Sequence, residues 1–505
     1  MKTKQSVTAF AIACAAVISA HAGEVTAVKP YAVAVSADYV IQPLLSVGER
    51  VPNTSDPTKQ YQMIGIPDGL GATKGHGNTT ILFMNHELTT TTLSEPNVGG
   101  PLNRGGFVSR FVLDKDGCVI SGERAYDTVF DAQNNVVLPA PEVGNTTPAF
   151  GRFCSSSLSF REAGFDRPIY LTGEESGGAG TFDGKGGLGV AIFDKQVHTL
   201  VKMGRYAWEN TLARPDAGEW TVIMGMEDGP ASLDNQLYMY VGKKDRRNGA
   251  SVLSRNGLDT GKLYTFVSNT PGQVSELTLT SGSITGTWVE LPDQTNVDET
   301  TLEAQTDAVG AFTFVRIEDG AWSKTDKNKF YFVTTGSGPV TAGNVLGRGY
   351  QLDFDKNNIL GTTTLSVIYN GDTVAAAGGD IGFAPDNIET SKDYLMVQED
   401  GTSQSRPEYA KRARDGSIWR HDLKNILSPK RIVELNPPGA VVTAPATVPP
   451  VVGPGVWETS GIIETSDFFG RDSWLFVVQA HSPSGRPAAN TVEDGQLLLM
   501  LPAKP

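Results

Sequence analysis

The sequence predicts an all-β protein whose strands form a β-propeller, and three observations carry this prediction. Short runs rich in β-branched and aromatic residues recur along the whole chain, with turn signals between them. The 56 glycines and the scarcity of long charged stretches argue against a helical protein. Six strand-like runs lead into acidic residues, and these six repeats predict six blades with elaborated loops between them.

Each expected strand is a short run bounded by turn residues. The runs cover residues 80–84, 107–113, 169–172, 190–193, 221–226, 236–241, 263–267, 313–317, 330–334, 350–354, 394–398, 418–421, 474–479 and 496–501. Asp116-Gly117 and Asp415-Gly416 place glycine where a tight hairpin turn needs a positive φ angle. A sandwich of this size is rare, and an outer-membrane barrel needs strands of about 10 residues with a lipid-facing apolar stripe, so a propeller fits best.

One propeller domain is expected from residue 23 to residue 505. Residues 1–22 resemble an export signal, because lysines precede an apolar run and Ala20-His21-Ala22 offers small residues at a cleavage site. A proline-rich stretch at 436–455 lacks periodicity and is expected to be a surface loop. We therefore expect a secreted or periplasmic protein.

The charge and the cysteine count restrict the partners and the source of stability. A formal charge of −14 repels nucleic acid and anionic membranes, so we expect neither as a partner. An anionic substrate would need bound cations that invert the local field. Cys118 and Cys154 either form one disulfide or stay free, and they are too few to stabilise so long a chain without a large core or metals. We expect a monomer that acts on a small molecule.

Acidic residues at the ends of strand-like runs are the candidate metal ligands. The motifs are Asn85-His86-Glu87, Glu174-Glu175, Glu227-Asp228, Glu318-Asp319, Glu399-Asp400 and Trp457-Glu458-Thr459. If equivalent strands of successive blades carry them, they meet at one mouth of the central channel, where crowded carboxylates repel each other unless cations lie between them. Hard oxygen ligands of this kind suit calcium. The alternative interpretation is that each motif is only a polar turn after a buried strand.

Strand alternation separates the residues around two of these motifs. Asn85 and Glu87 share one direction and are candidate ligands, whereas His86 points to the opposite side. Arg316 and Glu318 leave the same face of their strand, which places a guanidinium beside a candidate ligand. Arginine matches phosphate oxygens, and a structural ion pair is the alternative role for Arg316.

The sequence lacks the motifs of several common enzyme classes. The glycine-rich segment 184–189 precedes a strand and does not open a helix, so it is not a dinucleotide-binding fingerprint. The chain has no Gly-x-Ser-x-Gly elbow, no Walker loop and no His-Glu-x-x-His pair. These absences exclude the common serine hydrolases, P-loop ATPases and zincins.

As an ordered set, the motifs resemble those of the PhoX family of secreted alkaline phosphatases. The resemblance rests on Gly65-Ile66-Pro67-Asp68-Gly69-Leu70-Gly71, Asn85-His86-Glu87-Leu88, Leu171-Thr172-Gly173-Glu174-Glu175, Glu227-Asp228-Gly229-Pro230, Arg316-Ile317-Glu318-Asp319, Asp386-Asn387-Ile388 and Gln398-Glu399-Asp400-Gly401. It implies a six-bladed propeller that hydrolyses phosphate monoesters at a cluster of ferric iron and calcium, without a protein nucleophile. It also implies metal ligands at Glu87, Glu174, Glu175, Glu227, Glu318, Asp319, Glu399 and Asp400, with Asn85, Asn387 and Arg316 near the substrate.

One position departs from the family pattern, because Gly173 stands where the family has a cysteine directly before the Glu-Glu pair. A site without a thiolate favours several calcium ions, with ferric iron or another transition metal as the alternative. Cys154 lies too far along the chain from Glu174 to be assumed as a substitute. Two other functions stay open: a calcium-dependent propeller phosphodiesterase, esterase or lactonase, and a non-enzymatic binding propeller that calcium stabilises.

Overall fold

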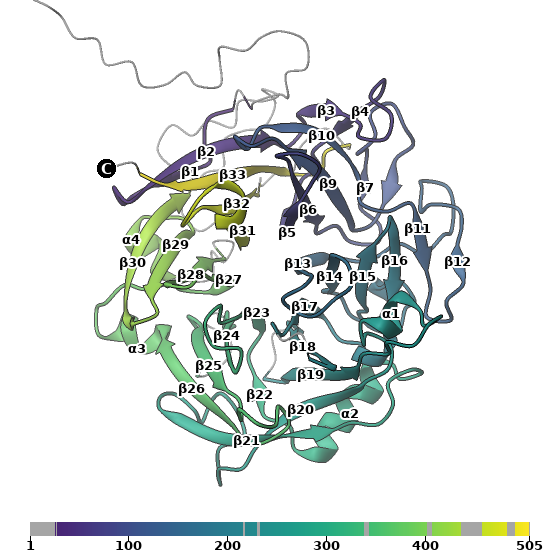
Figure 1. Cartoon of the computed structure of the whole chain (residues 1–505). Helices are drawn as coiled ribbons and strands as arrows, with labels where there is room; N and C mark the ends of the chain where they lie inside the picture. Colours follow the sequence, from purple (N-terminus) through teal and green to yellow (C-terminus); the bar gives the residue numbers. More distant parts are fainter. Residues whose placement is uncertain are drawn as a thin grey trace, which may run out of the picture.

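The computed structural model of the protein describes residues 26, 28–215, 218–229, 233–337, 343–400, 407–435, 457–481 and 490–503. Strands are the dominant elements, and they form six blades around a central axis (Figure 1). The predicted all-β propeller is thereby confirmed. The expected export signal at 1–22 and the proline-rich loop at 436–455 lie outside the described residues.

One strand from each blade lies next to the axis. These innermost strands are β5 (Pro67–Lys74), β13 (Phe153–Ser159), β17 (Trp208–Ala213), β23 (Ile317–Trp322), β27 (Pro385–Thr390) and β31 (Glu458–Glu464). Each contacts the next in this order, and β31 contacts β5. The ring of contacts is therefore closed and contains the six blades that the acidic motifs predict.

Blades 1 to 3 extend outward from β5, β13 and β17 by strand pairing. Blade 1 adds β6 (Thr80–His86), β9 (Phe107–Leu113) and β10 (Val119–Arg124). Blade 2 adds β14 (Ile169–Glu174), β15 (Gly189–Phe193) and β16 (Gln196–Thr199), followed by β11 (Thr128–Phe130) and β12 (Val136–Val137). Blade 3 adds β18 (Trp220–Glu227), β19 (Asn235–Lys243), β20 (Lys262–Ser268) and β21 (Ser283–Glu290).

Blades 4 to 6 extend in the same way from β23, β27 and β31. Blade 4 adds β24 (Lys329–Thr334), β25 (Arg348–Asp353) and β26 (Thr363–Asn370), and β26 pairs with β21, which joins blades 3 and 4 in one sheet. Blade 5 adds β28 (Tyr394–Glu399), β29 (Ser417–Asp422), β30 (Asn425–Leu435) and β1 (Ala32–Ala34). Blade 6 adds β32 (Trp474–Ala480), β33 (Asp494–Pro502) and β2 (Tyr39–Ser46).

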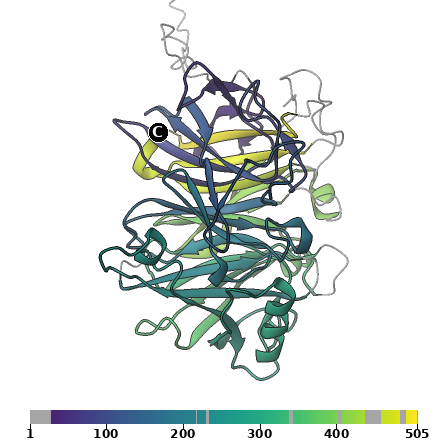
Figure 2. The same cartoon turned by 90° about the vertical axis from the view of Figure 1, so that its right-hand side faces the viewer.

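The ring is closed by strands from the start of the chain. β2 pairs with β33 and β1 pairs with β30, both antiparallel. Figure 2 shows the purple N-terminal strands beside the yellow C-terminal strands. Opening the ring would break these ladders, so the closure stabilises all six blades together.

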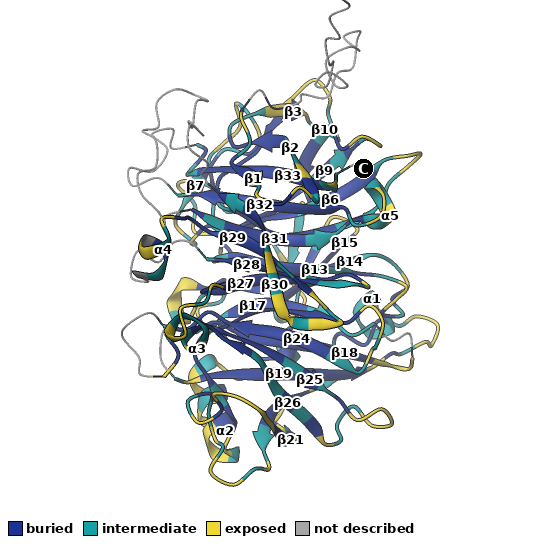
Figure 3. Ribbon diagram, turned by 90° about the vertical axis from the view of Figure 1, so that its left-hand side faces the viewer, coloured by how far each residue is buried: buried dark blue, intermediate teal, exposed yellow. Residues whose placement is uncertain are grey.

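Apolar cores lie between neighbouring blades. Because both faces of a blade are covered, middle strands such as β14 and β32 are buried along their whole length (Figure 3). In β32 the sequence accordingly begins with five successive apolar residues. Met224 and Phe332 belong to the core between blades 3 and 4, and Leu82 and Leu475 to the core between blades 1 and 6. These cores hold the innermost strands in fixed positions around the axis.

All but one of the expected strands coincide with the second and outer strands of the blades. The exception is the run 313–317, which is not one strand: it covers β22 and only the first residue of β23, and Arg316 lies between them with a left-handed backbone. The other innermost strands were not predicted. The innermost strands carry many small and polar residues, as Phe-Cys-Ser-Ser-Ser-Leu-Ser in β13 illustrates. Because their side chains face the axis, they need no apolar periodicity. This difference decides which site residues the sequence could indicate.

Short elements complete the fold. They are the strand pairs β3 (Arg50–Pro52) with β4 (Gln60–Gln62) and β7 (Leu93–Ser94) with β8 (Asn103–Arg104), the strand β22 (Thr313–Phe314), the 3-10 turns η1 (Gly178–Gly180) and η2 (Val201–Met203), and the helices α1 (Val252–Arg255), α2 (Glu299–Val309), α3 (Gly371–Ala376), α4 (Pro407–Arg412) and α5 (Ser466–Phe469). Within the described ranges, none of these helices has the length and apolar character needed to cross a membrane. No disulfide joins Cys118 and Cys154, so the pairing that the sequence left open is not formed.

Candidate metal centre

The geometry of a blade brings two chain segments to the same end of the ring. The innermost strand starts where its antiparallel neighbour ends, as the pairings of Phe153 with Glu174 and of Pro385 with Glu399 show. Residues at the start of an innermost strand and residues just after a second strand therefore share one mouth of the channel. Each of the six acidic motifs falls at one of these two places.

Two sets of side chains result from this arrangement. The strand-start set consists of Asp68, Cys154, Glu209, Glu318, Asp386 and Glu458, from blades 1 to 6 in order. The strand-end set consists of Glu87, Glu175, Asp228, Asp400 and His481, which directly follow the second strands of blades 1, 2, 3, 5 and 6. All of them except Asp68 line one cavity of about 370 Å³, together with Arg152 and Arg316. We call this space the mouth cavity.

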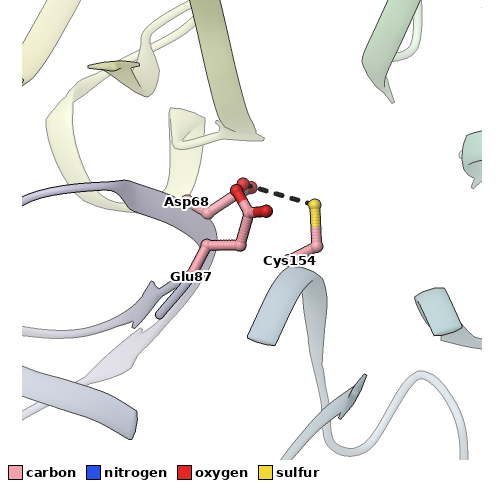
Figure 4. A group of neighbouring side chains, drawn as sticks. All are labelled: Asp68, Glu87 and Cys154. Carbon is pink, nitrogen blue, oxygen red and sulfur yellow. Dashed lines mark hydrogen bonds between the residues drawn. The ribbon is translucent and has the colours of Figure 1, made fainter. Parts of the chain in front are cut away.

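Three groups of ligand atoms in the mouth lie close enough to hold metal ions. The groups are Asp68, Glu87 and Cys154; Cys154, Glu175 and Glu209; and Glu209, Glu318 and Asp386, with the ligand atoms of each group within 4.8 Å of one another. Cys154 is shared by the first two groups and Glu209 by the last two, so the groups form a connected row. Figure 4 shows the first group, in which the Cys154 thiol donates to Asp68 Oδ2 at 3.3 Å.

Two carboxylate oxygens in this row fit a bound cation. Asp68 Oδ1 and Glu209 Oε2 are buried and accept no hydrogen bond from the residues that the structure describes. A buried carboxylate oxygen without a partner is destabilising, and a metal ion would satisfy it. The row also combines one sulfur with several oxygens, a donor set that suits both hard and softer cations.

Burial raises the pKa values of three groups in the row, Cys154, Glu209 and Asp386. For Glu209 and Asp386, burial is the largest cause, and Glu318 adds to it, so the pKa of each carboxyl lies well above its ordinary range. The pKa of the Cys154 thiol is raised by burial and by Asp68. Without cations these groups therefore retain protons, and cation binding would release them.

Two arginines bring positive charge to the mouth cavity, and both form ion pairs with candidate ligands. The pairs are Arg316 with Asp228 (2.9 and 2.7 Å) and with Glu318 (3.2 Å), and Arg152 with Glu175 (2.8 Å) and with Glu87. Burial alone would lower the pKa of the Arg316 guanidinium. The negative charges of Asp228 and Glu318 outweigh this effect and raise its pKa, so Arg316 stays charged. The arginines are thus held by carboxylates on one side while they line the cavity.

The residue directly before the innermost strand has a left-handed backbone in four blades. These residues are Ile66 (φ 50°), Arg152 (φ 45°), Arg316 (φ 56°) and Ala384 (φ 45°). A positive φ is rare for residues with a side chain and especially for β-branched residues such as Ile66. Strained backbone of this kind concentrates at functional sites. At Arg152 and Arg316 the strained residue itself lines the mouth cavity.

A larger cavity of about 930 Å³ adjoins the mouth cavity. Both cavities are lined by Arg152, Glu175, Asp228 and Arg316. The remaining wall includes residues of α2 and a fourth acidic group, which consists of Asp234, Glu303 and Asp307. A ligand held by the two arginines can therefore extend into this second space.

Five of the residues predicted from the sequence line the mouth cavity. They are Glu87, Glu175, Glu318, Asp400 and Arg316. The prediction that His86 points away from this side is confirmed, because its ring is buried and hydrogen-bonds Ser109 Oγ at 2.7 Å.

Four other predicted ligands do not line the mouth cavity, because hydrogen-bond donors elsewhere hold their carboxylates. Their partners are the backbone N–H groups of Gly151, Phe182 and Leu188 for Glu174; the Gln236 N–H for Glu227; Asn210, Gly320 and Ile388 for Asp319; and Arg414 and Phe383 for Glu399. Successive side chains of a strand face opposite sides, so in each acidic pair one member faces the mouth and the other faces the blade. Glu227 differs from the other three, because it lines the larger cavity.

The two asparagines predicted near the substrate are buried and do not line the mouth cavity. Asn85 Nδ2 donates to the Cys154 carbonyl at 2.5 Å, which joins blade 1 to the start of β13. Asn387 Nδ2 donates to the Ser155 hydroxyl, and its Oδ1 accepts from the Gly461 N–H at 3.0 Å. Both asparagines therefore position innermost strands of other blades.

Most of the strand-start set was missed by the sequence reasoning. Asp68 and Asp386 stand within the quoted family motifs, but neither was assigned a function; next to Asp386, only Asn387 was. Glu209 is a lone acid in β17, a strand that no apolar periodicity reveals. Arg152 was unassigned, and Asp228 was named only as a member of an acidic motif in which Glu227 took the ligand role. Alternation along the strand could have distinguished Asp228 from Glu227.

Position 173 cannot hold a cysteine in this fold. A Cβ atom on Gly173 would lie 2.4 Å from the Trp208 Cβ, far inside contact distance. The start of β13 lies beside the end of β14, so Cys154 reaches the same ligand group as Glu175 despite their separation along the chain. The expectation of a site without a thiol is therefore wrong.

Comparisons with known proteins give one family match and several structural matches. The family model described as "Alkaline phosphatase PhoX" matches residues 194–426. The structure of Pseudomonas fluorescens PhoX in complex with vanadate, a transition state analogue, matches with a TM-score of 0.64 at 16% identity, covering 92% of this chain and 95% of that chain. A putative glycoside hydrolase from Bacteroides ovatus gives a TM-score of 0.30 at 10% identity, covering 90% of this chain and 93% of its own.

No curated protein sequence matches the chain. At 16% identity the PhoX structure shows the fold that the two chains share. The family match covers blades 3 and 4 in full, blade 2 in part and most of blade 5, including β27, β28 and β29. It supports the predicted enzyme class, a phosphoric ester hydrolase. It confirms the resemblance to the PhoX family of alkaline phosphatases that the sequence motifs predicted.

Proposed function

We propose that this protein is a metal-dependent phosphatase that hydrolyses phosphate monoesters in the mouth cavity. The observation that carries the proposal is the connected row of three ligand groups, in which Cys154 and Glu209 are shared, beside Arg152 and Arg316. A row of this kind can hold several cations next to two phosphate-binding side chains. The family match over residues 194–426 supports the same chemistry.

We propose that the row holds calcium together with ferric iron or another transition metal. The two groups that contain Cys154 offer a sulfur ligand, which suits a transition metal, whereas Glu209, Glu318 and Asp386 offer only hard oxygens, which suit calcium. The unpartnered oxygens of Asp68 and Glu209 favour bound cations over an empty, hydrogen-bonded site. When bound, such ions neutralise phosphoryl charge, activate a water-derived nucleophile and stabilise the leaving oxygen.

The chain's own residues orient the ester. Arg316 is held by both oxygens of Asp228, so its planar fork is positioned before a phosphoryl group arrives. Arg152 lies on the same border between the two cavities, and the larger cavity offers space for the alcohol part of the ester. Asn85 fixes the start of β13 and hence the position of the Cys154 thiol.

The test is an activity and metal profile of the purified protein. Phosphate monoesters, phosphate diesters and lactones are assayed side by side, with elemental analysis and visible spectra of the same sample. Turnover of the monoesters by protein that contains calcium supports the proposal. If the protein prefers diesters, carboxylic esters or lactones, the site has a different hydrolase function. If metal-loaded protein turns over none of these substrates, the result favours a calcium-stabilised binding propeller.

We also propose that the protein is exported and acts as a monomer on small molecules. The export proposal rests on residues 1–22, and fractionation of the native host with N-terminal sequencing tests it. Mature protein in the cytoplasm with an intact N-terminus would contradict it. Light scattering after gel filtration tests the monomer.

A further inference from the structure

A separate cavity of about 430 Å³ lies at the outer edges of blades 1 and 2. It shares no lining residue with the mouth cavity or with the larger cavity beside it. Much of its wall is apolar and stiff, and this part includes Pro101, Pro139, Pro141, Pro148, Val137 and Phe150. Its volume falls in the range of about 300–1,000 Å³ that is typical of small-molecule sites.

Arg124, at the end of β10, lines this cavity and forms no ion pair with any residue that the structure describes. Its Nε is buried without a hydrogen-bond partner. Its two terminal nitrogens donate only at 3.4 Å, to Asn103 Oδ1 and to the Tyr126 hydroxyl. These contacts lie at the long limit of hydrogen bonding. The residue is half-buried, so its guanidinium keeps donor capacity that a ligand entering from solvent could use.

The nearest carboxylate in sequence does not compensate Arg124. Glu123 is already paired with Arg110 at 3.2 Å and with Lys195 at 3.0 Å. Two aromatic rings hold the Arg124 guanidinium in place, at 5.2 Å from the Phe107 centroid and 4.8 Å from the Tyr126 centroid. Arg124 is thus a positioned cation with no anionic partner of its own among the described residues.

We propose that this cavity binds a small monocarboxylate with an apolar body. The planar fork of Arg124 matches a carboxylate group, and the proline-rich wall with Phe150 matches an aromatic or branched body. The same wall also contains the ion pair of Glu123 with Lys195 and the acids Asp127 and Glu142. The two acids outside this pair disfavour ligands with several negative charges, which favours one carboxylate over a phosphate or a polyanion. This site is independent of the proposed phosphatase site.

The test titrates benzoate and phenylacetate into the metal-loaded protein by calorimetry, with benzyl alcohol as the neutral probe. The wild type should bind the two carboxylates saturably and benzyl alcohol at least about tenfold more weakly, because only the anions use the charge of Arg124. Arg124→Gln should weaken benzoate binding at least about tenfold and leave phosphatase turnover unchanged. The matched control is Arg161→Gln, which removes an exposed arginine that lies over the Phe160 ring outside the cavity.

A second variant keeps the test decisive if Arg124→Gln does not fold. Val129→Phe fills part of the cavity and retains the arginine, and it should also abolish benzoate binding. The inference is overturned if wild-type protein does not bind either carboxylate at millimolar concentration. It is also overturned if benzyl alcohol binds as tightly as benzoate, or if both cavity variants bind benzoate as the wild type does.

Discussion

Replacing Glu209 by glutamine tests whether the carboxylates of the mouth cavity hold metals. Glu209 belongs to two of the three ligand groups, and its Oε2 is buried without a partner among the described residues. Glutamine keeps the volume of the side chain and can still accept from the Ser155 hydroxyl, which lies 2.5 Å from Oε1. The substitution therefore removes one anionic ligand from two groups with little change in packing.

The expected loss is at least about 100-fold in metal affinity and in turnover. Residues that only support a metal ligand contribute about 10- to 100-fold, and Glu209 is itself a candidate ligand shared by two groups. A 100-fold weakening corresponds to about 2.7 kcal/mol of lost metal-dependent stabilisation. In the chelated protein the sign reverses, because burial and the Glu318 charge raise the pKa of Glu209. The chelated wild type must therefore take up a proton at Glu209 when it folds, whereas glutamine is neutral without that cost. The chelated variant should therefore melt at or above the temperature of the chelated wild type.

Elemental analysis, turnover and thermal unfolding with and without chelator measure these effects. The matched control is Asp319→Asn, because the Asp319 carboxylate accepts from Asn210 at 2.6 Å and from two backbone N–H groups outside the mouth cavity. The control should retain its metals and lose about 1–3 kcal/mol of stability in both states. Full metal content and turnover in Glu209→Gln would refute the reasoning, as would a chelated variant destabilised as much as the control.

Three further predictions follow from the same contacts. Cys154→Ser should lose the transition metal and its visible absorption while it keeps calcium, and unchanged elemental analysis would remove the thiol from the site. The variants Arg316→Ala and Arg152→Ala should each raise KM for a phosphate monoester, and inhibition by inorganic phosphate should weaken at least about tenfold. Lost stability with unchanged phosphate inhibition would indicate that the two arginines form only structural ion pairs. The chelated protein should lose stability as the pH rises from about 4 to 8, and melting curves recorded across this pH range measure the loss. Burial raises the pKa of Glu174 to about 8 and that of Asp319 to about 7. The folded protein therefore retains protons that the unfolded chain releases near pH 4. A melting temperature that rises over this range would contradict the assigned burial.

The outer parts of the fold could be predicted because their determinants are local. Strands such as β18 and β32 are buried on both faces, so their sequences are continuous apolar runs. The innermost strands could not be predicted in the same way, because their side chains face the axis. In β27, for example, Pro-Asp-Asn-Ile-Glu-Thr has no apolar period, although most of its residues are buried.

The site could be predicted mainly where acids follow an apolar second strand, and Glu318 is the exception, because it stands near the start of the innermost strand β23. Glu87 and Glu175 stand at such ends, so both were found from the sequence. Asp68 and Glu209 stand at the starts of innermost strands, where no preceding apolar run indicates their position. Cys154 was set aside for its distance along the chain, which the antiparallel pairing of β13 with β14 makes irrelevant.

The repetition of blades explains why the missed residues form a connected row. The second residue of the innermost strand is an ionisable donor in five consecutive blades, which supply Asp68, Cys154, Glu209, Glu318 and Asp386 in order. Equivalent positions of neighbouring blades lie next to each other around the axis, because each innermost strand contacts the next. The three ligand groups accordingly follow the ring from blade 1 to blade 5, and each shared ligand stands on a blade between two groups. The proposed polynuclear centre would therefore be a direct consequence of one donor position repeated by the propeller. If it forms, the loss of any single donor should disturb the neighbouring groups on both sides more than the distant ones.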